Sequence, residues 1–210
     1  METFFSTFVA TLYNEMLSLQ LVELIAALLA LAYVLLAAKQ KIACWLCAFA
    51  SSSLYVVIFW QAQLPYQAAL NVFYVAMAIY GWLTWQRIDN NGEPMKVREL
   101  GALKHLFVVT GLTVVCWVLL AIQSQVELSV THYLDTAIAV FSVFTTWLVV
   151  QKYLANWIYW IVINTAAVWL YASQSLYFTS VLFCLYVLMS VYGLISWRAA
   201  LRDNTDTSIM

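Results

Sequence analysis

Polar side chains recur on one face of the apolar stretch Leu154–Ala172. Asn156, Trp160, Asn164 and Tyr171 follow one another at spacings of four, four and seven residues, which places them along one side of a helix. Amides in such a stretch are costly unless they pair or face a cavity. Because an amide side chain both donates and accepts hydrogen bonds, this face predicts recognition of a polar organic ligand.

A second group of polar and aromatic residues lies in the other apolar stretches. Asn71 shares a helical face with Gln67 and Tyr74. We expect Asn71 and Asn164 to bind ligand. We expect Ser51–Ser53 and Ser190 chiefly to bond helices together. Ser52 still joins the ligand group, because an internal repeat pairs it with Asn164. The candidate substrate-binding residues are Asn164, Trp160, Asn71, Tyr74, Gln67, Tyr186 and Ser52.

Two carboxylates, Glu23 and Asp135, stand about one turn inside the outer ends of their stretches. Either they bond neighbouring helices, or they attract a cation and form a gate at the outer entrance together with Gln63. Proton coupling is the weaker alternative, since neither acid reaches mid-membrane.

The cysteines and histidines are not arranged as a metal or redox site. Cys44 and Cys47 form a C-x-x-C pair without a second pair, and we interpret them as packing residues. His105 and His132 fall on opposite sides of the predicted membrane. We predict no metal, no cofactor and no enzymatic activity, since H-E-x-x-H and G-x-S-x-G motifs are absent as well.

The elements that carry these residues are seven apolar stretches, each near the ~20 residues that a membrane-spanning helix needs. All nine Lys and Arg residues fall in loops on one side, which predicts an outer N-terminus and a cytoplasmic C-terminus. A chain that is 65% hydrophobic and 9% charged is neither a soluble domain nor a nucleic-acid-binding protein. The stretches are Leu19–Ala38, Ile42–Trp60, Tyr66–Gln86, Lys104–Ile122, Thr131–Val150, Leu154–Ala172 and Tyr177–Trp197.

An internal repeat organises the stretches. Shifted by 112 residues, the chain matches itself, so that Tyr80-Gly81-x-x-x-Trp85 meets Tyr192-Gly193-x-x-x-Trp197. We predict two parallel three-helix units joined by one connecting helix, an architecture of transporters with a site between the units. The predicted parts are an outer interfacial segment 1–17, repeat 18–87, a cytoplasmic loop and connecting helix 88–130, repeat 131–199 and a cytoplasmic tail 200–210.

Two motifs resemble those of the PnuC vitamin transporters. They are Tyr-Gly-Trp-x-x-Trp at 80–85 and the run Lys152-Tyr-x-x-Asn156-Trp157-x-x-Trp160-x-x-x-Asn164. Gln61, Gln63, Glu23 and Asp135 also stand where that family has equivalents, and the resemblance covers residues 18–199. It implies a SWEET-like 3+1+3 fold in the bacterial inner membrane, and facilitated diffusion of nicotinamide riboside followed by trapping through phosphorylation.

Alternatives to this reading stay open. The resemblance also implies relatives that carry thiamine or riboflavin, and Asn71 stands where the family often has Gln. A seven-helix receptor would have the same count and orientation of helices, although a retinal protein would need a lysine in the last stretch. A small molecule and the lipid bilayer are the expected partners. The remaining apolar faces are also compatible with a homo-oligomer.

Overall fold

The computed structural model describes residues 21–88, 94–122 and 129–207, and each predicted apolar stretch forms a helix there. The predicted outer segment 1–17 lies outside the described residues. The last helix continues past the predicted end Trp197, because residues 198–202 are good helix formers and no Gly or Pro follows before its end at Thr207. The helices are α2 Leu21–Ala38, α3 Cys44–Gln61, α4 Pro65–Trp85, α5 Ala102–Ile122, α6 Val130–Val150, α7 Ala155–Ser173 and α8 Tyr177–Thr207.

Six of the described helices are long and apolar enough to cross a membrane, and α7 is the exception. Its 19 residues are sufficient in length, so the shortfall comes from polar residues such as Asn156 and Asn164. Both amides are buried, together with Trp157 and Leu170 of the same helix. Much of the surface of α7 therefore faces protein rather than lipid.

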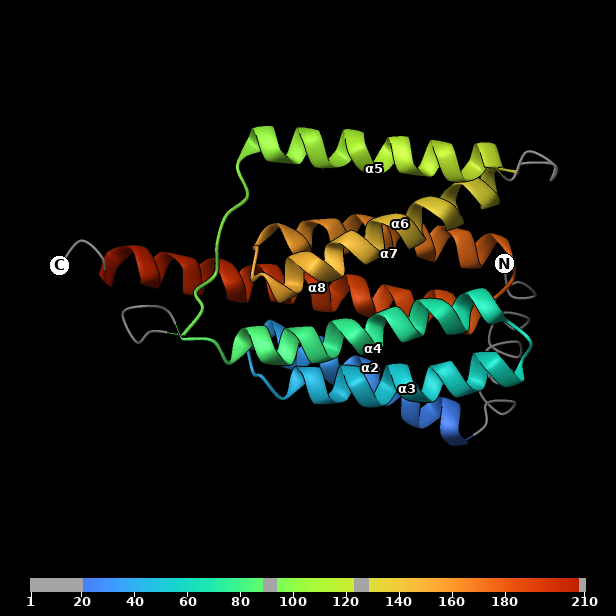
Figure 1. Cartoon of the computed structure of the whole chain (residues 1–210), viewed down its shortest axis with the longest axis horizontal. Helices are drawn as coiled ribbons and strands as arrows, with labels where there is room; N and C mark the ends of the chain where they lie inside the picture. Colours follow the sequence, from blue (N-terminus) through green and yellow to red (C-terminus); the bar gives the residue numbers. More distant parts are fainter. Residues whose placement is uncertain (1–20, 89–93, 123–128, 208–210) are drawn as a thin grey trace, which may run out of the picture.

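The helices form two triplets, which are α2–α4 and α6–α8 (Figure 1). Helix α2 packs against α8 and α4 packs against α6, so the triplets meet through equivalent helices. Helix α5 lies apart from both triplets in Figure 1 and packs mainly against α6. Its His105 also stacks on Tyr159 of α7, with Nδ1 and the tyrosine hydroxyl 3.1 Å apart.

The turns of the two triplets repeat the same backbone geometry. Gln40 and Lys152, 112 residues apart, have φ values of 53° and 52°. Gln63 and Ser175, at the same offset, have φ values of 60° and 61°. A positive φ is uncommon outside glycine, so its recurrence at equivalent turns supports the repeat that the sequence predicts.

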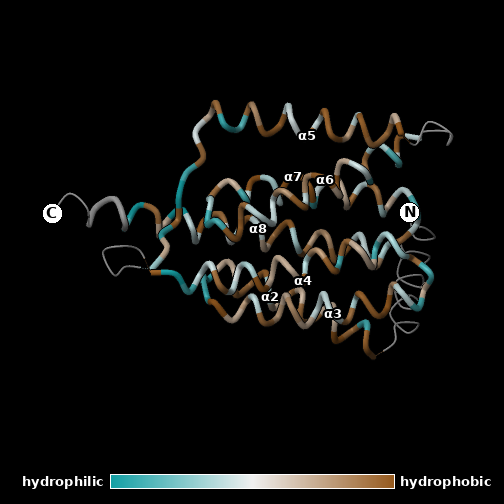
Figure 2. The backbone as a smooth tube through the Cα atoms, viewed as in Figure 1, coloured by the Kyte–Doolittle hydropathy of each residue, from teal (hydrophilic) through white to brown (hydrophobic). Residues whose placement is uncertain are grey.

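One end of the bundle carries all the described Lys and Arg residues, and we call it the basic end. The turns 39–43 and 151–154 and the segment 94–101 lie there, beside the last part of α8. Figure 2 shows the hydrophilic segments at the two ends of the bundle and hydrophobic helices between them. By the positive-inside rule, the basic end is the side that we predict to be cytoplasmic.

Four tryptophans, two from each triplet, form the core of the basic end. Trp45 meets Trp85 edge to face with ring centroids 5.3 Å apart, and Trp157 meets Trp197 in the same way at 5.6 Å. Trp85 and Trp197 join the two pairs at 6.2 Å. The sequence left open whether these residues are interfacial anchors or packing residues. All four are at most 7% exposed and belong to the hydrophobic core, so they are packing residues.

Two of the tryptophans also bond the triplets together. Trp85 Nε1 donates to Val150 O at 3.0 Å, and Trp197 Nε1 donates to Ala37 O at 3.0 Å. Each acceptor lies in the last turn of a helix, where carbonyls have no partner within the helix. The indole N–H groups of Trp45 and Trp157 are buried and find no partner among the described residues.

This difference gives a matched pair of substitutions. We expect Trp85→Phe to destabilise the protein by about 1–3 kcal/mol more than Trp45→Phe does, because only Trp85→Phe leaves a buried carbonyl without its donor. Both substitutions remove a similar ring volume, so the comparison isolates the hydrogen bond. Thermal unfolding of the purified variants in one detergent measures the difference. Equal unfolding midpoints would contradict the role given to the Trp85 indole.

Candidate functional site

The polar face of α7 divides into two parts in the structure. Asn156 is fully buried at the basic end, and its Nδ2 donates to Tyr153 O at 2.7 Å. It therefore holds the turn before α7 in place. Asn164 is 5% exposed and lies two turns further along the same helix, away from that end. Of the two amides, Asn164 is the one placed to meet a ligand within the bundle.

Asn164 belongs to a short chain of hydrogen bonds between α7 and α8. Its Nδ2 donates to Ser190 Oγ at 3.3 Å, and Ser190 Oγ donates to Tyr186 O at 2.7 Å. Ser190 therefore bonds helices together, as the sequence predicts. No described residue donates to Asn164 Oδ1, which leaves a carbonyl acceptor on a side chain whose orientation is already fixed.

The first triplet places its candidates differently. Asn71 is 8% exposed, and its Nδ2 donates to Gln67 O of the preceding turn at 2.9 Å. Tyr74 of α4 lies near Ser142 of α6, where the two triplets pack together. Ser52, the repeat partner of Asn164, is buried in α3. Its neighbour Ser51 donates to Ala26 O at 2.8 Å, which confirms the helix-bonding role predicted for Ser51.

Aromatic rings lie along α7 and α8 on both sides of the Asn164–Ser190 pair. Phe183 is stacked on Tyr171 with centroids 5.2 Å apart and meets Tyr186 edge to face at 5.7 Å. Trp160 lies one turn from Asn164 and packs, partly buried, against the tryptophan core. The rings therefore come from α7 and α8 and lie between the amide and the two ends of the bundle.

The structure adds residues that the sequence did not single out. Tyr55 of α3 lies near Tyr186 of α8, and Tyr33 of α2 lies near Tyr74 of α4. Ser142 contacts Tyr74 from the opposite triplet. No spacing rule within a single helix reveals these partners, because each pair joins two helices that are distant in the sequence.

The predicted entrance residues Glu23, Asp135 and Gln63 do not converge on Asn164. Gln63 is exposed at the end of the bundle opposite the basic end, and so is Gln67, which the sequence predicts to bind substrate. Glu23 is half-buried near Tyr55, and Asp135 is exposed near Tyr171. The two acids thus occupy corresponding places in the two triplets, each beside a tyrosine. This arrangement is compatible with both roles that the sequence left open.

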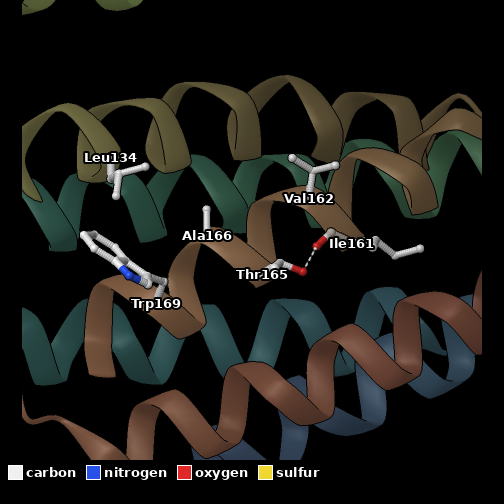
Figure 3. A pocket seen from close by; sticks show the side chains of 6 residues that line it. All are labelled: Leu134, Ile161, Val162, Thr165, Ala166 and Trp169. Carbon is white, nitrogen blue, oxygen red and sulfur yellow. Dashed lines mark hydrogen bonds between the residues drawn. The ribbon is translucent and has the colours of Figure 1, made fainter. Parts of the chain in front are cut away.

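An apolar hollow lies on the other side of α7 from Asn164. Figure 3 shows Leu134 of α6 facing Ala166, Thr165 and Trp169 of α7. Thr165 Oγ1 donates to Ile161 O of its own helix at 2.7 Å, so the hollow offers no free hydroxyl donor. Trp169 is 54% exposed at its rim. This hollow has the character of a groove on the lipid-facing surface, and none of the predicted substrate-binding residues lines it.

The part of the chain that the structure describes contains no candidate metal site. No group of three or more His, Cys, Asp or Glu side chains gathers among these residues. The four cysteines are free thiols, and Cys44 packs in the tryptophan core.

Comparison with known proteins finds relatives that match most of the chain. Nicotinamide riboside transporter PnuC of Escherichia coli (strain K12) is 27% identical over 213 residues, which cover 90% of this chain and 89% of that protein. Nicotinamide riboside transporter PnuC of Neisseria mucosa is 27% identical over 199 residues, which cover 86% of this chain and 73% of that protein. The resemblance to PnuC proteins predicted from the sequence is confirmed.

A solved structure shares the fold. The crystal structure of the vitamin B3 transporter PnuC superposes with a TM-score of 0.70 at 23% identity, covering 93% of this chain and 90% of that one. The match confirms an all-helical membrane fold. The family model described as nicotinamide mononucleotide transporter matches residues 20–199. Because this match covers most of its length, the chain belongs to the nicotinamide mononucleotide transporter family.

Proposed function

We propose that this chain carries nicotinamide riboside across the bacterial inner membrane by facilitated diffusion. The relatives that bear this name support the substrate. The observation that carries the proposal is the buried Asn164 amide, held by Ser190 and flanked by aromatic rings, in a bundle whose described cations all lie at one end.

The chemistry of the substrate suits these groups. Nicotinamide riboside has a flat, cationic pyridinium ring, a carboxamide and a ribose with free hydroxyls. Aromatic faces attract a cation, and Trp160, Tyr74 and Tyr186 supply such faces. The Asn164 carbonyl accepts a hydrogen bond from an amide or a hydroxyl, and Asn71 offers a second amide from the other triplet.

The same site disfavours a phosphorylated nucleotide. A phosphate within the membrane needs Arg or Lys to balance its charge, and the described cations lie at the basic end. The position of the cations therefore favours nicotinamide riboside as the substrate over nicotinamide mononucleotide. The description of the family, in contrast, names the mononucleotide. Phosphorylation inside the cell would then trap the vitamin, because its product could not return through the same site.

The positions of the acidic residues bear on whether transport is coupled to protons. The acids Glu23 and Asp135 stand near the outer helix ends, so neither forms a mid-membrane proton relay. We infer that concentration alone sets the direction of transport and that the chain is not an enzyme. We expect no nucleic-acid partner, and the exposed apolar side chains of the described helices are compatible with lipid contact or a homo-oligomer.

Uptake into proteoliposomes tests the proposal. Purified protein is reconstituted without any ion gradient, and labelled nicotinamide riboside, nicotinamide mononucleotide, thiamine and riboflavin are supplied in parallel. We expect saturable riboside uptake that equilibrates without concentrating, and mononucleotide uptake at least about 10-fold slower, the ratio that 1.4 kcal/mol of discrimination gives.

Other outcomes have definite meanings. Faster uptake of thiamine or riboflavin would keep the site and change its substrate. Mononucleotide uptake as fast as riboside uptake would contradict the argument from the absent mid-membrane cation. Accumulation above the outside concentration would contradict facilitated diffusion.

A further inference from the structure

The basic end of the bundle is closed by bonds between the triplets. Tyr74 of α4 and Ser142 of α6 also lie near each other, at a point away from this end. Among the described residues, five side-chain hydrogen bonds cross between the triplets at the basic end. They run from Trp85 to Val150, from Gln151 to Tyr80, from Lys152 to Gln40, from Ser196 to Ala38 and from Trp197 to Ala37.

Lys152 occupies the centre of this closed end. It lies in the turn between α6 and α7, and its Nζ donates to Oε1 of Gln40, its equivalent in the repeat, at 3.3 Å. Two equivalent residues can touch only near the axis that relates the triplets. Lys152 is therefore an axial residue, although only 7% of its surface is exposed.

Two further contacts hold the ammonium group of Lys152. Its Nζ donates to Met95 O at 2.9 Å and lies 4.6 Å from the centroid of the Trp85 ring. Burial lowers the pKa of Lys152, because the low-dielectric surroundings disfavour its charged form. A buried charge is tolerated only while such partners remain in place, so losing them favours exposure of the side chain to water.

The segment 94–98 covers Lys152. Arg98 N donates to Lys152 O at 2.9 Å and Leu154 N donates to Arg98 O at 2.8 Å, which forms one step of parallel β pairing. The Arg98 guanidinium donates to Gln151 O at 2.9 Å and lies 4.7 Å from the centroid of the Tyr153 ring. Val97, 4% exposed, inserts into the tryptophan core. These bonds join the segment to the turn of the second triplet, and Pro94 pairs with Ile88, just beyond α4 of the first triplet. The segment therefore connects the two triplets at the basic end.

We propose that residues 94–98 are a latch, pinned by Lys152, that must leave the axis before the triplets can part at the basic end. This inference rests on the transport function proposed above, since a carrier must open this end to release its substrate. While the latch is closed, the Lys152 ammonium also stands on the exit path, where it repels a cationic vitamin. Opening breaks the Lys152–Gln40 bond and withdraws that charge.

A reversible cross-link tests the latch. Arg98 and Tyr153 are paired in the bridge, so the double variant Arg98→Cys/Tyr153→Cys places two thiols where a disulfide can form. Cys47, Cys116 and Cys184 are replaced by alanine, and buried Cys44 is kept. We expect oxidation to lower riboside uptake into proteoliposomes at least 10-fold and reduction to restore it. Uptake that is equally fast in the oxidised protein, with the cross-link verified by mass, would overturn the proposal.

The retained Cys44 gives a readout that does not depend on transport. It is fully buried in the same core and is reached by a water-soluble maleimide only when the basic end opens. We expect oxidation of the double variant to slow Cys44 labelling at least 10-fold. If no form of the protein takes up riboside, the transport proposal fails and this labelling rate alone decides the latch. An unchanged labelling rate overturns it.

Substituting the pin separates its role from general stability. We expect Lys152→Gln to speed Cys44 labelling about 10-fold, because the axial contacts are lost, and Lys152→Arg to restore slow labelling. The matched control is Lys104→Gln, which removes an exposed cation at the start of α5. If Lys104→Gln accelerates labelling as much as Lys152→Gln does, the effect is one of net charge and the latch is overturned.

Discussion

Gly81→Ala and Gly193→Ala each destabilise the protein by about 1–3 kcal/mol or more, the range for overpacking a filled core. A Cβ atom at Gly81 would lie 2.4 Å from the Trp45 ring, and one at Gly193 would lie 2.6 Å from the Trp157 ring. Neither indole can move away easily, because both are 2% exposed and packed edge to face against a second tryptophan. The equivalent glycines thus let equivalent helices approach closely.

Thermal unfolding in detergent measures the loss, which corresponds to about 2–4 °C per kcal/mol for a chain of this length. The matched control is Gly111→Ala within α5, where an added Cβ meets nothing within 4 Å. We expect that variant to be as stable as the parent or more stable by about 0.5–1 kcal/mol, because alanine favours a helix. Equal losses at Gly81 and Gly111 would show that the tryptophan contact is not the cause.

Asn164→Leu lowers riboside uptake about 10–100-fold while the protein still folds, because loss of one buried hydrogen-bonding group costs about 1–3 kcal/mol. Leucine has a similar volume but neither accepts from the substrate nor donates to Ser190. Initial uptake rates over a range of riboside concentrations, together with direct binding of the riboside, show whether recognition is lost.

The control for this variant is the neighbouring residue. Thr165 lies in the apolar groove on the other side of α7 and bonds only its own helix, so Thr165→Val should leave uptake within about twofold of the parent. Asn164→Gln keeps the amide and should retain more uptake than Asn164→Leu does. Wild-type uptake by Asn164→Leu would show that the ligand lies elsewhere in the bundle.

The sequence by itself determined the membrane helices, the basic end and the repeat. Long apolar stretches must become helices in a membrane, because every backbone group needs an internal partner there. Cations collect on one side for an equally local reason, the cost of moving them across during insertion. The 112-residue offset was also visible, since Gly81 and Trp85 recur as Gly193 and Trp197. These features depend on composition and spacing along the chain.

Only the tertiary structure decided what the individual polar residues do. Spacing put Asn156 and Asn164 on one face of α7, yet Asn156 fixes a turn and Asn164 bonds Ser190 of α8. In the sequence, Lys152 is one loop cation among nine, but the packed triplets enclose it at the axis against Gln40 and Met95. Partners so distant in sequence are chosen by how the helices pack, and a single helix period cannot encode that choice.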